Sequence, residues 1–146
     1  PVARSEWDTQ VLHPENYLLV AAPSLLEKTP LNQIKDAENH TLLDADRSLP
    51  LSRYLISANN PEIPFGQMRM CGTGAAMLAM VRAGRGLAVL PEYMVEEDLK
   101  TGTLVRPLPE LEMLSDTFRL LYRKDHPLSQ MLEVLGEFLK EQPIVG

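Results

Sequence analysis

A threonine flanked by two glycines stands where an expected strand meets an expected helix. The segment Cys71-Gly72-Thr73-Gly74 joins a strand-like run over residues 67–70 to an apolar helix expected over residues 75–83. Glycines allow a ligand or a neighbouring backbone to approach closely, and the first amides of a helix attract an anion or carboxylate. The Thr73 hydroxyl can add a hydrogen bond. This turn is therefore the first candidate for a small-molecule site.

The same segment also has a purely structural interpretation, in which Thr73 only caps its helix and the glycines only form the turn. Cys71 is open to two interpretations as well. A thiol just before a helix can become a reactive thiolate, so an enzyme with Cys71 as its nucleophile is one alternative. We favour a buried structural thiol, because the chain has only one cysteine and none is left as a resolving partner.

Other residues that could do chemistry are not arranged for it. His13, His40 and His126 are scattered and form no catalytic triad or ligand pair. The acidic run Glu96-Glu97-Asp98 is expected to be a solvated helix face. Gly84-Arg85-Gly86 lies between the end of a helix and the start of a strand, whereas a glycine-rich phosphate-binding turn lies between a strand and the start of a helix. We therefore expect no catalytic residues, no metal and no cofactor.

Strands and helices alternate along the chain, which predicts an α/β fold with a mainly parallel sheet flanked by helices. Ligands of such sheets bind beyond the carboxyl ends of the strands, at segments that here are Pro23-Ser24, Asp44–Ser48, Cys71–Gly74 and Pro91-Glu92. The expected strands are 15–22, 40–43, 67–70, 86–90, 104–105 and 118–122. The expected helices are a short one after Thr29-Pro30, then 49–58, 75–83, 92–100 and a C-terminal helix.

Composition sets the class of the protein. The chain has 146 residues, of which 45% are hydrophobic and 23% charged, as expected for one globular domain. A net charge of -6 without a cluster of basic residues excludes DNA binding by this chain alone. No apolar run is long enough to span a membrane and no signal peptide is visible, so we expect no membrane association and a cytoplasmic protein.

Several motifs in the chain resemble the effector domain of LysR-type transcription regulators. Residues 80–91 (MVRAGRGLAVLP), followed by Glu97-Asp98-Leu99 and Gly102-Thr103-Leu104-Val105, are similar to the core motif of that domain. The run 17–23 (YLLVAAP) resembles the strand that first crosses into the second lobe. Residues 118–122 (FRLLY), 126–129 (HPLS) and the final helix resemble the return to the first lobe. The resemblance spans nearly the whole chain.

The resemblance implies a type 2 periplasmic-binding-protein fold, with the effector in a cleft between two lobes. Residues 1–146 would then be a single effector-binding fragment, with the second lobe and its crossover strands at 15–122. The C-terminal helix in 123–146 would return to a mostly absent first lobe, and the DNA-binding helix-turn-helix would be absent. Effector contacts carried over from the family are Cys71, Gly72, Thr73 and Gly74, then Ala22, Pro23 and Ser24, and lastly Leu121.

The function that the resemblance implies is effector sensing: a small molecule binds the cleft and changes DNA binding by the full-length regulator. Thr73 and the helix amides favour an anionic molecule. The alternative is a fragment of a periplasmic solute-binding protein for transport. The C-terminal apolar stripe should pack on the first lobe in an intact protein, so here we expect it to be covered by self-association or by packing on the lobe present. That stripe comprises Leu128, Met131, Leu132, Leu135, Phe138 and Leu139.

Overall fold

The computed structural model describes residues 6–144, which fall into two compact units. The larger one, the sheet unit, comprises residues 16–115. The smaller one, the ribbon unit, combines the segment that ends at Glu15 with the segment that begins at Asp116. The chain thus leaves the ribbon unit once, completes the sheet unit without interruption and then returns.

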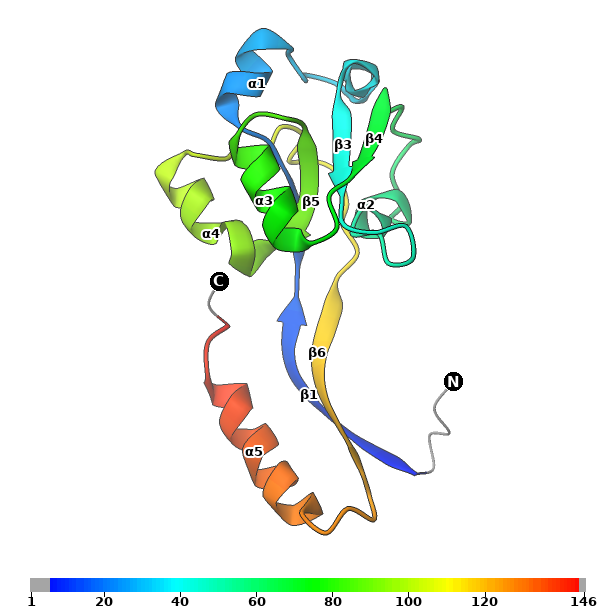
Figure 1. Ribbon diagram of the computed structural model, residues 1–146, viewed down its shortest axis with the longest axis vertical. Helices are drawn as coiled ribbons and strands as arrows, with labels where there is room; N and C mark the ends of the chain where they lie inside the picture. Colours follow the sequence, from blue (N-terminus) through cyan, green and yellow to red (C-terminus); the bar gives the residue numbers. More distant parts are fainter. Residues whose placement is uncertain (1–5, 145–146) are drawn as a thin grey trace. The chain divides into compact units, whose positions relative to one another are not determined.

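Four strands form the sheet of the sheet unit, in the order β2-β5-β3-β4 (Figure 1). They are β2 (Tyr17–Val20), β3 (Thr41–Asp44), β4 (Gln67–Met70) and β5 (Leu87–Pro91). Strands β5, β3 and β4 run parallel, whereas β2 runs antiparallel to β5. Beyond β2, a bridge pairs Ala21 with Val105. The predicted α/β fold with a mainly parallel sheet is confirmed, with a mixed strand orientation that the sequence did not reveal.

Helices cover both faces of this sheet, because neighbouring strand residues point to opposite sides. Leu42 packs in a cluster with residues of η1 (Ile34–Asn39) and α2 (Arg53–Ile56). Leu43 packs in a second cluster with residues of α3 (Gly74–Arg82) and α4 (Glu92–Thr101). Strand β5 is buried along its whole length, as its continuous apolar sequence predicts for a strand covered on both faces.

The ribbon unit consists of two long antiparallel strands and one helix (Figure 1). Strands β1 (Trp7–Glu15) and β6 (Asp116–Arg123) pair with a register shift between Val11 and His13. Helix α5 (Ser129–Glu141) packs its glycine against β1: Gly136 is buried, and a side chain there would collide with Gln10. His13 Nε2 lies 2.8 Å from the Leu139 carbonyl oxygen and further fixes the helix.

Five apolar side chains of α5 and the residue before it are exposed in this arrangement. They are Leu128, Met131, Val134, Leu135 and Phe138, whose exposed fractions range from 42% to 70%. The polar contacts with β1 thus use one side of the helix, and most of the predicted apolar stripe lies on another. Of that stripe, Leu132 and Leu139 are half-buried.

Several local predictions were wrong. The strand expected over 15–22 ends earlier, at Val20, and Pro23 opens helix α1 (Pro23–Lys28), since proline is favoured at the first helical position. The short helix expected after Thr29-Pro30 is present as the 3-10 helix η1, whereas the helix expected over 49–58 is reduced to one turn, α2. Strand β1 was not predicted. Helix α3 is only partly buried, since only Met77 and Val81 are fully covered.

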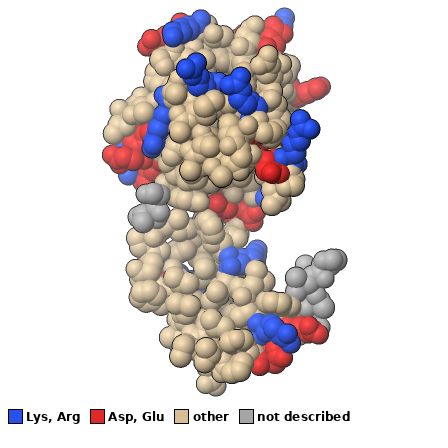
Figure 2. All heavy atoms as spheres, in the orientation of Figure 1, with Lys and Arg blue, Asp and Glu red and all other residues tan. Residues whose placement is uncertain are grey.

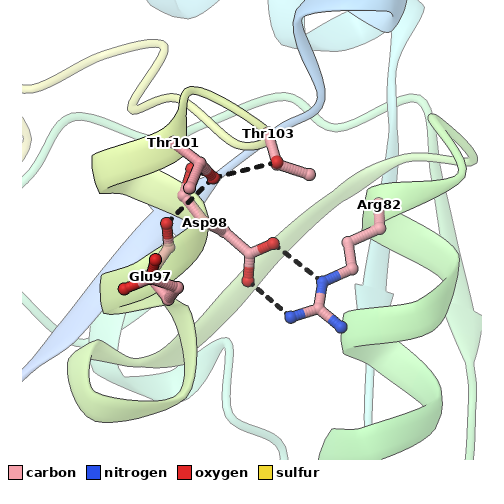
Figure 3. Close-up of polar contacts among 5 residues, drawn as sticks. All are labelled: Arg82, Glu97, Asp98, Thr101 and Thr103. Carbon is pink, nitrogen blue, oxygen red and sulfur yellow. Dashed lines mark hydrogen bonds and ion pairs between the residues drawn. The ribbon is translucent and has the colours of Figure 1, made fainter.

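An ion pair between α3 and α4 corrects one further prediction (Figure 3). Asp98 belongs to the acidic run expected in solvent, yet it is 5% exposed. Arg82 donates from Nε and Nη2 to the two Asp98 carboxylate oxygens, each at 2.8 Å. This bidentate contact raises the pKa of the Arg82 guanidinium. The backbone carbonyl of Asp98 also accepts from Leu104 N at 3.1 Å, so this residue joins α3, α4 and the segment that follows.

Candidate functional site

The loop after β3 is organised by Asp44, a buried carboxylate at the end of the strand. Its side chain accepts hydrogen bonds from the backbone amides of Ala45 at 2.8 Å, Leu51 at 2.7 Å and Ser52 at 3.3 Å. A buried carboxylate is costly unless such donors satisfy it. Asp44 therefore fixes the course of residues 45–52, a role that its sequence position in a polar loop did not reveal.

The turn after β4 is tied to that loop by two backbone hydrogen bonds. Cys71 N donates to Asp44 O at 2.7 Å, and Gly72 N donates to Ala45 O at 2.8 Å. Gly72 has a φ of +87°, and nothing lies within 4 Å of the place where its side chain would be. The glycine is needed here for its backbone conformation, and the space above it is open.

Thr73 is the N-cap of α3, as the structural interpretation of the turn predicted. Its hydroxyl oxygen accepts from Ala76 N at 3.1 Å, while its own hydroxyl proton stays available to a ligand. The first turn of α3 contains no acidic residue. The positive end of the helix dipole is therefore not neutralised within the helix, and a ligand carboxylate or phosphate placed there would be stabilised.

One exposed acidic residue lies in the loop that is bonded to this turn. Asp46 accepts hydrogen bonds from the side chain and the backbone amide of Ser48, and these bonds lower the pKa of the Asp46 carboxyl. The carboxylate is thus ionised at neutral pH. Asp46 directly follows Ala45, the residue whose carbonyl accepts from Gly72, and it keeps its negative charge, because Ser48 is a neutral donor.

The carboxyl end of β5 lies at the same edge of the sheet as those of β3 and β4, because the three strands are parallel. Glu92 follows β5 and is held by Asn16, which donates from Nδ2 to Glu92 Oε2 at 3.1 Å. Asn16 O in turn accepts from Glu92 N at 2.9 Å. The structure therefore brings three of the four predicted segments to one rim of the sheet: 44–48, 71–74 and 91–92.

The fourth segment, Pro23-Ser24, does not join them. Because β2 runs antiparallel to β5, the segment after β2 emerges at the opposite edge of the sheet. Ser24 lies there beside Gly84, and Ala22 is buried. The prediction of a common rim was wrong for these three residues. Leu121 lies on β6 of the ribbon unit and is 59% exposed.

Cys71 is the residue of the rim that could act as a nucleophile. Cys71 is half-buried, neither fully covered nor freely open, and its Sγ lies 3.8 Å from the Arg69 carbonyl oxygen. Within residues 6–144, no three His, Cys, Asp or Glu side chains are placed to hold a metal ion. In the same part of the chain, no helix is both long enough and apolar enough to cross a bilayer.

Comparison with known proteins identifies solved structures that share this architecture. Similar solved structures include the regulatory domain of CrgA, a LysR-type transcriptional regulator from Neisseria meningitidis, with 21% identity and a TM-score of 0.78 over 97% of this chain and 71% of that one. Full-length LysG from Corynebacterium glutamicum, solved with its effector Arg bound, has 18% identity and a TM-score of 0.75 over 100% of this chain and 50% of that one.

The effector domain of AmpR from Pseudomonas aeruginosa is also similar, with 21% identity and a TM-score of 0.70 over 95% of this chain and 66% of that one. The chain spans about half the length of the full-length regulators that it resembles. No curated protein matches it. The model of the LysR substrate binding domain family matches residues 1–143, and the chain therefore belongs to that family.

Proposed function

We propose that this chain is the effector-sensing part of a LysR-type transcription regulator and that it binds a small anionic molecule at the rim formed by Asp44–Ser48 and Cys71–Gly74. Binding favours one arrangement of the effector domain and thereby changes how the full-length protein holds DNA. The equilibrium can shift by no more than the difference in the effector's affinity for the two arrangements. Pro23, Ser24 and Leu121 are not needed by this proposal.

The family match over residues 1–143 is the observation that carries the proposal. The positive end of α3, which no acidic residue of its first turn neutralises, the open space above Gly72 and the free Thr73 hydroxyl proton support an anion at this rim. The chain itself has no basic footprint for DNA. On the face drawn in Figure 2, basic and acidic side chains are interspersed and neither sign forms a continuous band. DNA contact is accordingly assigned to a separate helix-turn-helix in the full-length protein.

The two alternatives are weaker. A solute-binding protein for transport shares the fold, but the family match is to regulators. An enzyme would need Cys71 as nucleophile, with a base beside it to take up the thiol proton. Among residues 6–144, the hydrogen-bonding contact of the Cys71 Sγ is with the Arg69 carbonyl oxygen, which is not a base.

The first prediction compares two glycines with the same backbone conformation. Gly72 and Gly102 have φ values of +87° and +75°, and neither has a neighbour within 4 Å of the place where a Cβ atom would lie. Replacing either by alanine should cost about 1–2 kcal/mol of folding free energy, because a side chain is strained there. Only Gly72→Ala also places a methyl group at the proposed site, so only this variant should bind the anion at least about tenfold more weakly, a loss of about 1.4 kcal/mol.

Thermal unfolding with a panel of carboxylates and phosphate esters, each paired with a neutral amide or alcohol, measures this difference. A ligand at about a hundred times its Kd should stabilise the wild-type chain and Gly102→Ala by about 2.7 kcal/mol. The proposal fails if no anion stabilises the chain more than its neutral counterpart, or if the two glycine variants lose the same affinity.

A further inference from the structure

A small cavity lies beside β2, which forms the edge of the sheet opposite to β4. All of its lining residues belong to the sheet unit. One wall is the start of β2 with the residue before it, and the other is the returning segment from Leu111 to Ser115. The volume is about 270 Å³, just below the range of drug-sized pockets, so the cavity suits a smaller molecule.

Two prolines explain why no further strand fills this place. The bridge between Ala21 and Val105 is antiparallel. Its continuation would place Pro107, and then Pro109, opposite the next residues of β2. Proline has no amide hydrogen to donate, so the ladder ends after Val105 and the chain leaves the edge of the sheet. The space beside the start of β2 is therefore a consequence of the sequence.

Two opposite charges line the cavity without an ionic partner. Glu92 is the first residue of α4, and one of its carboxylate oxygens accepts from Asn16 Nδ2 at 3.1 Å. Arg106 donates from Nη2 to the Pro109 carbonyl oxygen at 3.3 Å, which holds the guanidinium. Among residues 6–144, neither Glu92 nor Arg106 forms an ion pair, with the other or with a third residue. Both charges therefore remain available to a ligand.

Apolar side chains lie in the same cavity. Tyr17 is 4% exposed and Leu111 is 7% exposed, so both form a fixed wall, and Met113 is half-buried beside them. Leu114 N donates to Tyr54 O at 2.7 Å and fixes the segment that carries this wall. A short aliphatic group of a ligand would lose contact with water against these side chains.

The combination of charges selects the class of ligand. A simple carboxylate would meet Glu92 as well as Arg106, and a simple amine would meet Arg106 as well as Glu92, so each would face one repulsive contact. A molecule with both an ammonium group and a carboxylate satisfies both residues and can also place an aliphatic group on the apolar wall.

We propose that this cavity binds a free α-amino acid with an aliphatic side chain. Its ammonium group lies against Glu92, its carboxylate against Arg106 and its side chain on Leu111 and Met113. Glu92 belongs to the segment 91–92 at the rim of the sheet. The cavity contains no residue of 44–48 or 71–74, the segments that are proposed to bind the effector.

L-Leucine is the test probe, titrated calorimetrically into the whole chain beside three controls. Isocaproate lacks the ammonium group, isoamylamine lacks the carboxylate, and glycine lacks the aliphatic side chain. Leucine should bind about tenfold more tightly than each control, because each control loses one charge-assisted hydrogen bond or the apolar burial. Absence of leucine binding, or equal binding of isocaproate or isoamylamine, would overturn the proposal.

Matched variants test the two charged residues. Glu92→Gln and Arg106→Gln should each weaken leucine binding about tenfold. The glutamine of the first variant keeps an oxygen that can accept from Asn16, so the local structure is retained. Glu97→Gln and Arg85→Gln remove the same charges from exposed residues of the sheet unit and should leave the affinity unchanged. Equal losses in all four variants would contradict the assignment.

NMR shows where leucine binds and separates this site from the effector rim. Leucine should shift the methyl signal of Met113 but not that of Met77, which is buried in the other core cluster. The amide signals of Gly72 and Gly74 should stay unchanged. Shifts at these glycines with none at Met113 would refute the amino-acid site while leaving the proposed effector site intact.

Discussion

Thr73 shows how one residue can satisfy two interpretations at once. The sequence left open whether it caps a helix or binds a ligand. In the structure it caps helix α3 by accepting from Ala76 N, while its hydroxyl proton stays available to a ligand. The position of this turn was predictable, because the change from strand to helix is marked by a threonine between two glycines. Asp44 lies in one of the four segments that the sequence singled out, but its role in fixing the loop was not predicted, because charged residues are ordinary in a polar loop and only the folded chain shows which amides this carboxylate accepts from.

Arg82 and Asp98 carry a prediction at this scale. Truncating Arg82 to alanine leaves the buried Asp98 carboxylate without its bidentate partner. The variant should lower the free energy of unfolding by about 2 kcal/mol. This loss is smaller than at a fully buried ion pair, because the Arg82 side chain is half-exposed. Arg85→Ala, at an exposed arginine nearby in sequence, should change it by less than about 0.5 kcal/mol. Urea denaturation of both variants checks this, and equal stabilities would show that the ion pair contributes nothing.

The elements whose ends are marked by glycine or proline were predicted well, and the others were not. Strand β4 has the predicted bounds, and α3, α4 and β5 differ by a residue or so, since glycine or proline marks their ends. Strand β1 is polar and interrupted by Pro14, so its sequence carries no strand pattern. The direction of β2 could not be predicted either, because its apolar run is compatible with a parallel or an antiparallel pair. Since β2 is antiparallel to β5, Ser24 lies at the opposite edge of the sheet from the rim.

Helix η1 carries a prediction about pH. Asp36 accepts from the Asn32 and Gln33 amides and from the Gln33 side chain, and these bonds lower the pKa of its carboxyl below 3.8. A lowered pKa in the folded state means that the contribution to stability is present at neutral pH and is lost as the pH falls below 3.8 and through the folded-state pKa. Asp36→Asn should therefore be less stable than the wild type at neutral pH, and the difference should shrink in acid.

The control for this pH dependence is Glu38→Gln, which removes a carboxylate from the same helix where no side-chain hydrogen bond is formed. Unfolding curves of both variants and the wild type, recorded from neutral pH down to about pH 3, compare the loss of Asp36 with the loss of another carboxylate from the same helix. If Asp36→Asn and the wild type differ by the same amount at every pH, the carboxylate of Asp36 does not hold η1 in its charged form.

At the scale of the whole molecule, the exposed apolar face of α5 predicts association between copies of the chain. Five apolar side chains are uncovered there, and burying them stabilises a complex by about 25 cal/mol per Å² of apolar area. Sedimentation should show dimers or larger species for the wild type and monomers for Met131→Gln/Phe138→Gln. Leu49→Gln, at an equally exposed apolar residue of the sheet unit, should associate like the wild type, whereas a monomeric wild type would refute self-association.

The account depends most on where a small anion binds. An amide NMR titration with the most stabilising anion of the thermal panel tests this directly on the whole chain. We expect the largest shifts at Gly72, Gly74 and Ala75, with smaller ones in the Asp44–Ser48 loop that is bonded to this turn. Saturable binding whose shifts leave residues 71–76 unchanged would contradict the proposed site and, with it, the proposed mode of effector sensing.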